Sequence, residues 1–276
     1  MSNHMPPPTE TTVRPHGGGP LLAVDRVGPQ CRIVIKRIDK HNALSRQTLA
    51  SLRSAIEEAE SDSTVSYIVI RGDGERYFAA GGDLIDLSSV RTEAETAEFA
   101  SSSRAALDAV RDCLLPVIAF VNGEALGGGA ELAMACDLRV MTAAARIGYV
   151  QARLAITSAW GGAVDLCAAV GPARAMRMMM RAEMVGAAEA LEIGLCEAVV
   201  EGDLDGAQAQ AFFAPIDRVP RHVLVATKAN IVACRSAATY QAAREIEQRN
   251  LIATWADGAH WAAVDRFLSR PRSDAR

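Results

Sequence analysis

The sequence predicts an α/β protein in which a parallel β/α core is followed by a helical C-terminal region. Two observations lead to this class. Apolar, β-rich runs alternate with stretches of helical periodicity from residue 21 to the strand at 137–141, and the last third of the chain, from residue 161, is predicted mostly helical. Such alternation is typical of parallel β/α units that share one core. Half of the 276 residues are hydrophobic, which is sufficient for a core of this size.

The first elements are predicted from turn residues and periodicity. Residues 1–20 are rich in proline and glycine and are expected to form a flexible tail. The β-rich runs 21–27 and 31–38 form a hairpin across a Gly-Pro turn. A helix then begins at Ser45, which is expected to cap it, and its apolar residues recur at three- and four-residue spacing to about Glu60.

Three buried strands follow, at 66–71, 116–121 and 137–141, and a helix is predicted over 93–112. Further helices are predicted at 161–170, 172–184, 187–194, 220–235, 239–256 and 259–268. Only the A-V-V segment at 198–200 is typical of a strand in this last part. We therefore expect an α/β core over residues 21–200 and a helical region over 201–276.

Charge and cysteine content exclude several classes of protein. The chain has 29 Lys and Arg against 33 Asp and Glu, so it has no basic excess to neutralise a nucleic acid. No apolar run approaches the roughly 18 residues of a membrane span, and no secretory segment follows the first residue. The six cysteines are scattered, which argues against disulfides and a metal site. We expect a cytoplasmic protein without nucleic-acid or membrane partners.

Two glycine-containing turns are candidates for a ligand site, because each comes shortly after a buried strand. They occupy residues 77–84 and 122–133. Ligands of α/β proteins gather at the carboxyl ends of strands, and glycine lets the backbone approach them closely. Either turn alone is also explained by tight packing of a strand against a helix. The spacing required for a phosphate-binding loop is absent.

Taken together, these motifs resemble the enoyl-CoA hydratase/isomerase, or crotonase, superfamily. The matching segments are D-K-H-N-A-L-S (39–45), F-A-A-G-G-D (78–83), N-G-E-A-L-G-G-G-A-E-L-A-M-A-C-D (122–137) and A-W-G-G (159–162). The resemblance extends over about residues 21–270. It implies a crotonase-like spiral of β/α units, a helical C-terminal region used for oligomerisation, and a homotrimer or homohexamer.

The resemblance also implies an acyl-CoA substrate and an oxyanion hole. In this family two backbone N–H groups hold the thioester oxygen, and the matching positions are Ala80 and Gly128. Two such donors would stabilise the negative oxygen of an enolate. The expected substrate-binding residues are Ala43, Ala79, Gly81, Gly82, Asp83, Gln151 and Trp160. Coenzyme A is part of the substrate, and no separate cofactor or metal is implied.

The catalytic carboxylates depart from the hydratase pattern. Hydratases of this family use two glutamates, and the first corresponds to Glu131, which we expect to be catalytic. Glu131 could alternatively be an acid that merely favours the start of a helix. The second position is occupied by Gln151, whose amide cannot ionise. This substitution argues against hydration by two carboxylates.

Three hypotheses follow for the activity. Trp160 before Gly-Gly, and L-I-A-T-W at 251–255, are similar to ethylmalonyl-CoA decarboxylases. Loss of CO₂ from a malonyl thioester leaves an enolate, so an oxyanion hole would suffice without a base. The first hypothesis is therefore decarboxylation of a short alkylmalonyl-CoA. The second is an enoyl-CoA hydratase or isomerase that uses Glu131 alone. The third is a non-catalytic protein that binds CoA thioesters.

Overall fold

The computed structural model describes residues 11–13, 21–158 and 160–236, and it separates into two compact units. The first unit ends at Asp217 and the second begins at Arg218. The division of the chain into a core over 21–200 and a helical region over 201–276 stays a prediction. Of the second unit the structure describes one helix, α8 (Arg221–Ser236). The expected helices at 239–256 and 259–268, and the 251–255 motif, lie outside the described residues.

The larger sheet forms the core of the first unit. Within the described residues it has seven strands in the order β1 (Thr11–Val13), β2 (Leu22–Val27), β3 (Gln30–Ile35), β4 (Tyr67–Gly72), β6 (Val117–Val121), β8 (Leu138–Thr142) and β11 (Ala198–Val200). From β3 onward all neighbouring strands are parallel, as predicted. β6 is buried along its whole length, and its uninterrupted apolar sequence is typical of a parallel strand covered on both faces.

The N-terminal edge of this sheet differs partly from the prediction. The hairpin of β2 and β3 is confirmed as an antiparallel pair. However, β1 lies within the segment expected to be a tail and pairs with residues 22–24. Its three residues are all β-branched, and such side chains favour extended backbone.

A smaller sheet was not predicted as such. Its strands, in order, are β10 (Met184–Gly186), β9 (Arg146–Gly148), β7 (Glu124–Leu126) and β5 (Tyr77–Ala79). Each has three residues, which is too short for a period-two pattern to stand out in a sequence. β5 and β7 belong to the two glycine-containing turns and pair in parallel. The sheet therefore brings together two turns that are far apart in the sequence.

The helices of the first unit agree largely with the prediction. They are α1 (Arg46–Ser61), α2 (Glu93–Asp112), α3 (Gly128–Ala135), α4 (Gly162–Val170), α5 (Pro172–Arg181), α6 (Ala187–Glu192) and α7 (Ala207–Asp217). The Ser45 side chain caps α1 by accepting from the Thr48 N–H, as expected. α7 was missed, since it contains Pro215, a residue that normally interrupts helices.

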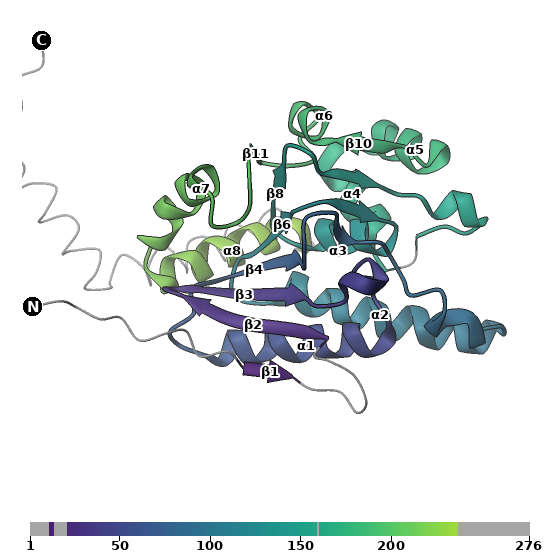
Figure 1. Cartoon of the computed structure of the whole chain (residues 1–276), viewed down its shortest axis with the longest axis horizontal. Coiled ribbons are helices and arrows are strands. Elements are labelled where there is room, and N and C mark those ends of the chain that lie inside the picture. Colours follow the sequence, from purple (N-terminus) through teal and green to yellow (C-terminus); the bar gives the residue numbers. More distant parts are fainter. Residues whose placement is uncertain (1–10, 14–20, 159, 237–276) are drawn as a thin grey trace, which may run out of the picture. The chain divides into compact units, whose positions relative to one another are not determined.

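The arrangement of these helices determines where the site can form. α1 and α2 lie side by side on one face of the larger sheet (Figure 1). α3 follows β7 directly and contacts β5 and α4, so its first turn lies where the two glycine-containing turns meet. A search of the described helices finds none that is long and apolar enough to cross a membrane.

Candidate active site

One cavity of about 170 Å³ gathers most of the predicted site residues, and we call it the glycine cavity. The predicted residues that line it are Ala80, Gly81, Gly82, Gly128, Glu131, Gln151 and Trp160. The other three predicted substrate-binding residues, Ala43, Ala79 and Asp83, are not among its lining residues. The structure thus brings together residues from both glycine-containing turns and from the segment after β9.

Gly128 presents a backbone N–H at the start of α3. As the first residue of this helix, it has no acceptor within the helix for its N–H. The positive end of the helix dipole adds to the attraction for a negative oxygen at this point. A Cβ on Gly128 would lie 2.3 Å from Trp160 Cζ3, so only glycine lets the indole ring pack here. Gly128 is therefore placed where an oxyanion donor could act, and its role stays a prediction.

The expectation for Ala80 is wrong, because its N–H is already used. It donates to the carbonyl oxygen of His41 at 3.0 Å. His41 and Asn42 have positive φ angles, and this backbone shape turns the His41 carbonyl towards Ala80. Ala80 lines the glycine cavity, but its N–H cannot hold a substrate oxygen while this bond persists.

Gly82 offers an N–H in the first turn that pairing directs away from the neighbouring loop. This residue forms a parallel bridge with Leu44, in which the Gly81 carbonyl accepts from the Leu44 N–H and the Asp83 N–H donates to the Leu44 carbonyl. In such pairing the N–H and carbonyl of the intervening residue face the opposite side. Gly82 lines the glycine cavity, and no hydrogen bond of its N–H is found within the described residues.

Asp83 and Ala43 hold the first turn in place. Arg37 donates to the Asp83 carboxylate at 2.7 Å and also to the Ala43 carbonyl. The other Asp83 oxygen accepts from the backbone N–H groups of Ile85 and Asp86. Burial alone would raise the pKa of Asp83, but Arg37 and these N–H groups lower it overall. The carboxylate is thus committed to the protein's own backbone and to Arg37.

Glu131 is the buried carboxylate of the glycine cavity, with 3% of the residue exposed. One oxygen, Oε1, accepts from the N–H groups of Trp160 at 3.0 Å and Gly162 at 3.2 Å. The other, Oε2, accepts from Gln151 Nε2 at 3.1 Å. Burial raises the pKa of Glu131 above its ordinary value, and the three donors oppose this shift without cancelling it.

The backbone that holds Glu131 is itself fixed by two side chains. Arg111 donates to the Trp160 carbonyl at 2.9 Å and to Asp165 at 2.7 Å. The Tyr149 hydroxyl donates to the Gly162 carbonyl at 2.7 Å. Sequence analysis did not identify Arg111 or Tyr149. Neither belongs to a recognisable motif, and each acts through a carbonyl group, so no signal in the sequence could have indicated them.

Gln151 lies beside Glu131, where the resemblance places the second glutamate. Its amide nitrogen donates to Glu131, and its Oε1 is buried without a hydrogen-bond partner within the described residues. A buried, unpaired amide oxygen is costly, and it offers an acceptor to any donor that enters the cavity. No group of three or more His, Cys, Asp or Glu in the described ranges could hold a metal ion.

Trp160 and a set of aliphatic side chains make the rest of the cavity apolar. The indole packs on Gly128 and Gly82, and its ring meets that of Phe99 edge to face, with centroids 5.9 Å apart. Leu84, Leu154 and Ile156 line the same cavity and are largely exposed. An apolar cavity with a few convergent polar groups is typical of a small-molecule site.

Comparison with known proteins identifies the family to which this fold and site belong. The profile of the family described as Enoyl-CoA hydratase/isomerase matches residues 30–273. The chain therefore belongs to the enoyl-CoA hydratase/isomerase, or crotonase, family. A crystal structure described as an enoyl-CoA hydratase from Bacillus anthracis superimposes with a TM-score of 0.84 at 26% identity, covering 90% of this chain and 95% of that one. The predicted crotonase fold is confirmed.

Two curated relatives indicate which activities occur among similar proteins. The crotonyl-CoA hydratase of Syntrophomonas wolfei is 36% identical over 169 residues, which is 61% of this chain and 65% of that protein. The mitochondrial methylglutaconyl-CoA hydratase of Rattus norvegicus is 36% identical over 172 residues, 62% of this chain and 54% of the relative. The chain thus spans less than two thirds of the length of either relative. Both names describe hydratases, whereas the sequence motifs favoured a decarboxylase.

Proposed function

We propose that this protein is an acyl-CoA enzyme that adds water to a short enoyl thioester, or moves its double bond, with Glu131 as the proton-transferring group. The observation that supports this most strongly is the position of Glu131. It is a buried carboxylate that lines the same cavity as two backbone N–H groups, those of Gly82 and Gly128. The names of the relatives support hydration over decarboxylation. We therefore place hydration or isomerisation first and decarboxylation second, although the sequence motifs favoured decarboxylation.

The two N–H groups would bind the thioester oxygen. Attack of water at the β-carbon of an enoyl thioester moves an electron pair onto this oxygen and forms an enolate. Preorganised N–H donors stabilise such an oxygen more in the transition state than in the substrate, which is the condition for catalysis. At Gly128 the helix dipole acts in the same sense.

Glu131 would then manage the proton. A carboxylate offers about four lone pairs, and three are used by Trp160, Gly162 and Gln151. The remaining site on Oε2 can accept a proton from water as its oxygen bonds to the β-carbon. The same proton can then pass to the α-carbon as the enolate collapses. Glu131 ends the cycle ionised, and the thioester has gained one water.

Decarboxylation of a short alkylmalonyl-CoA is the second candidate, and Gln151 is the observation that favours it. An amide beside Glu131 can hydrogen-bond to a substrate carboxylate, whereas a second glutamate would repel it. At about 4 Å and an effective dielectric constant near 20, this repulsion amounts to about 4 kcal/mol. Cleavage of the bond to CO₂ would leave its electron pair in the same enolate, which the same two N–H groups would stabilise.

Incubation with a panel of acyl-CoAs, followed by mass spectrometry, separates these candidates. Gain of water by crotonyl-CoA supports hydration, and loss of CO₂ from ethylmalonyl-CoA supports the second candidate. Movement of the double bond leaves the mass unchanged and is detected by chromatographic separation of the isomers. The absence of both a mass change and a new isomer in every substrate indicates a thioester-binding protein without activity. Gln151→Glu is expected to accelerate hydration, because it adds a second titratable group, and to slow any decarboxylation. The expected homotrimer or homohexamer stays a prediction, for which light scattering is the measurement.

A further inference from the structure

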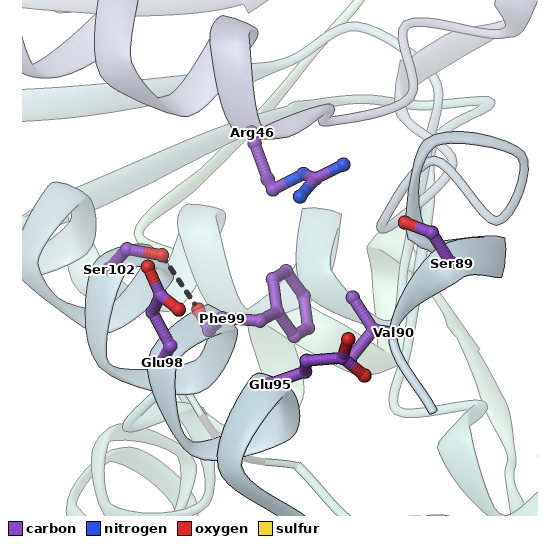
Figure 2. Close-up of a pocket in the computed structure, with 7 residues that line it drawn as sticks. All are labelled: Arg46, Ser89, Val90, Glu95, Glu98, Phe99 and Ser102. Carbon is purple, nitrogen blue, oxygen red and sulfur yellow. Dashed lines mark hydrogen bonds between the residues drawn. The ribbon is translucent and has the colours of Figure 1, made fainter. Parts of the chain in front are cut away.

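A second cavity adjoins the glycine cavity at Phe99, a residue that lines both. This second cavity, which we call the Arg46 cavity, also measures about 170 Å³. It lies between the start of α1, the segment around Val90 and the first half of α2 (Figure 2). Among the described residues, Phe99 is the one that lines both cavities.

The aromatic ring of Phe99 is placed to act as a partition between the glycine cavity and the Arg46 cavity. Figure 2 shows it projecting among Arg46, Val90 and Glu95. On its other side it meets the Trp160 indole edge to face. The indole in turn packs on Gly128 and Gly82, whose N–H groups would hold the thioester oxygen. A continuous row of groups therefore runs from the reacting end of the site through two aromatic rings to the Arg46 cavity.

The backbone that carries the ring belongs to a capped helix. Phe99 belongs to α2, which begins with a capping box between Thr92 and Glu95. The Phe99 carbonyl accepts from the Ser102 hydroxyl at 3.0 Å. The Phe99 side chain is half-buried, so its removal would leave space without exposing a large core. The partition therefore depends on one side chain rather than on the backbone.

We propose that Trp160 and Phe99 form the distal wall of the acyl site and determine the chain length of its substrate. On this view the glycine cavity accepts a short acyl group, and a longer chain collides with the Phe99 ring before it can reach the Arg46 cavity. This inference rests on the proposed function, since it assumes that the glycine cavity binds an acyl thioester. It goes beyond that function by naming the residues that select the substrate.

Binding of saturated acyl-CoAs tests the wall separately from the chemistry. Butyryl-CoA and octanoyl-CoA contain neither the double bond nor the extra carboxylate that the two candidate reactions need. Titration calorimetry with wild type should show tighter binding of butyryl-CoA. Without a wall, the extra methylenes of octanoyl-CoA would strengthen binding, because each one buries apolar surface.

Phe99→Ala should raise the affinity for octanoyl-CoA relative to butyryl-CoA by about tenfold or more, the discrimination expected of an apolar pocket that accommodates or excludes methylenes. Phe99→Leu, which keeps more of the wall, should give a smaller change. Phe212→Ala is the matched control, because Phe212 is also a half-buried helical phenylalanine and lines neither cavity. It should leave the ratio of affinities unchanged.

The outcomes separate the wall from the proposed function. Equal binding of the two ligands by wild type, or an equal change for both in Phe99→Ala, would overturn the wall. Selective binding of butyryl-CoA with no turnover of any acyl-CoA would support the wall and overturn the proposed reaction. If wild type binds neither ligand, the acyl-CoA function fails, and the inference fails with it.

Discussion

The two glycine-containing turns bring a backbone N–H to the same cavity, but they are held in place by different forces. The first turn is fixed by hydrogen bonds and charge. It pairs with the loop around Leu44 and is anchored by the Arg37–Asp83 ion pair. The second turn is fixed by packing, since every residue of α3 is buried and the Trp160 ring covers Gly128. The second turn also carries Glu131.

This difference decides how much change each turn tolerates. A Cβ on Gly82 would meet Leu87 Cδ1 at 3.1 Å, a contact that a flexible side chain can relieve. A Cβ on Gly128 would meet Trp160 at 2.3 Å, and the ring is enclosed. A methyl group at Gly82 can therefore be accommodated by a shift of Leu87, whereas one at Gly128 requires the enclosed Trp160 ring to move.

Loss of the Glu131 carboxylate should have the largest effect on activity. Each turn supplies an N–H to the cavity, but the proton-transferring carboxylate comes from the second turn alone. Glu131→Gln keeps the shape of the side chain, and we expect kcat to fall by about 10²–10⁴. The measurement is steady-state kinetics on whichever acyl-CoA is turned over. Wild-type kinetics in this variant would assign Glu131 to stabilisation of the helix start rather than to catalysis.

The pH dependence of the same variant sharpens this test. Burial raises the pKa of Glu131 above 4.5, so the acidic limb of the rate profile should lie above that value and be absent in Glu131→Gln. Ionisation in the folded state is disfavoured, so the wild type loses stability as pH rises from 4.5 through the raised pKa. Glu131→Gln should therefore unfold at higher denaturant concentration near neutral pH and not at low pH. A pH-independent difference would contradict this assignment.

Removal of the N–H in the first turn tests whether Gly82, rather than Ala80, is the donor. Gly82→Pro deletes this N–H and should lower kcat by about 10²–10³. Gly82→Ala keeps the N–H and is the matched control, with activity close to that of wild type. Circular dichroism checks that both variants fold. Unchanged kcat in a folded proline variant would exclude Gly82 from the oxyanion hole.

The packing of the second turn can be tested by an added methyl group. We expect Gly128→Ala to lower the free energy of unfolding by about 1–3 kcal/mol, because the indole must move. Gly82→Ala should cost less in the same urea titration. In the double variant Gly128→Ala/Trp160→Leu, part of the loss should be recovered through coupling between neighbours. Strictly additive effects would show that Trp160 does not impose the glycine.

The last prediction concerns the anchor of the first turn. Asp83→Asn removes the partner of a largely buried arginine and should lower the unfolding free energy by about 1–3 kcal/mol. Asp86→Asn is the control, because the Asp86–Arg46 pair is more exposed and is worth about 0–1 kcal/mol. Equal losses in the two variants, measured by urea unfolding, would remove the distinction between anchor and surface pair.

Much of the fold was predictable, because its signals are local. The Ser45 cap, the periodicity of α1 and α2 and the apolar sequence of β6 each act over a few neighbouring residues. The three-residue strands β5, β7, β9 and β10 were harder, since they are stabilised by partners distant in the chain. α7 was missed for a different reason, because Pro215 disfavours a helix locally, yet the helix forms in the folded protein.

Within the site, the sequence by itself determined the candidate groups: the glycines of both turns, Glu131, and the amide at Gln151. Gly128 was predicted from the family resemblance, and its place at the start of α3 agrees with that, because the start of a helix exposes its own N–H groups. The sequence pointed to Ala80 as the donor, and only the tertiary structure directs attention to Gly82, since the direction of an N–H in extended backbone depends on its pairing partner. Here that partner is the loop at His41–Leu44, brought in from elsewhere in the chain. The same holds for Phe99, which lines two cavities that exist only once α2 is packed.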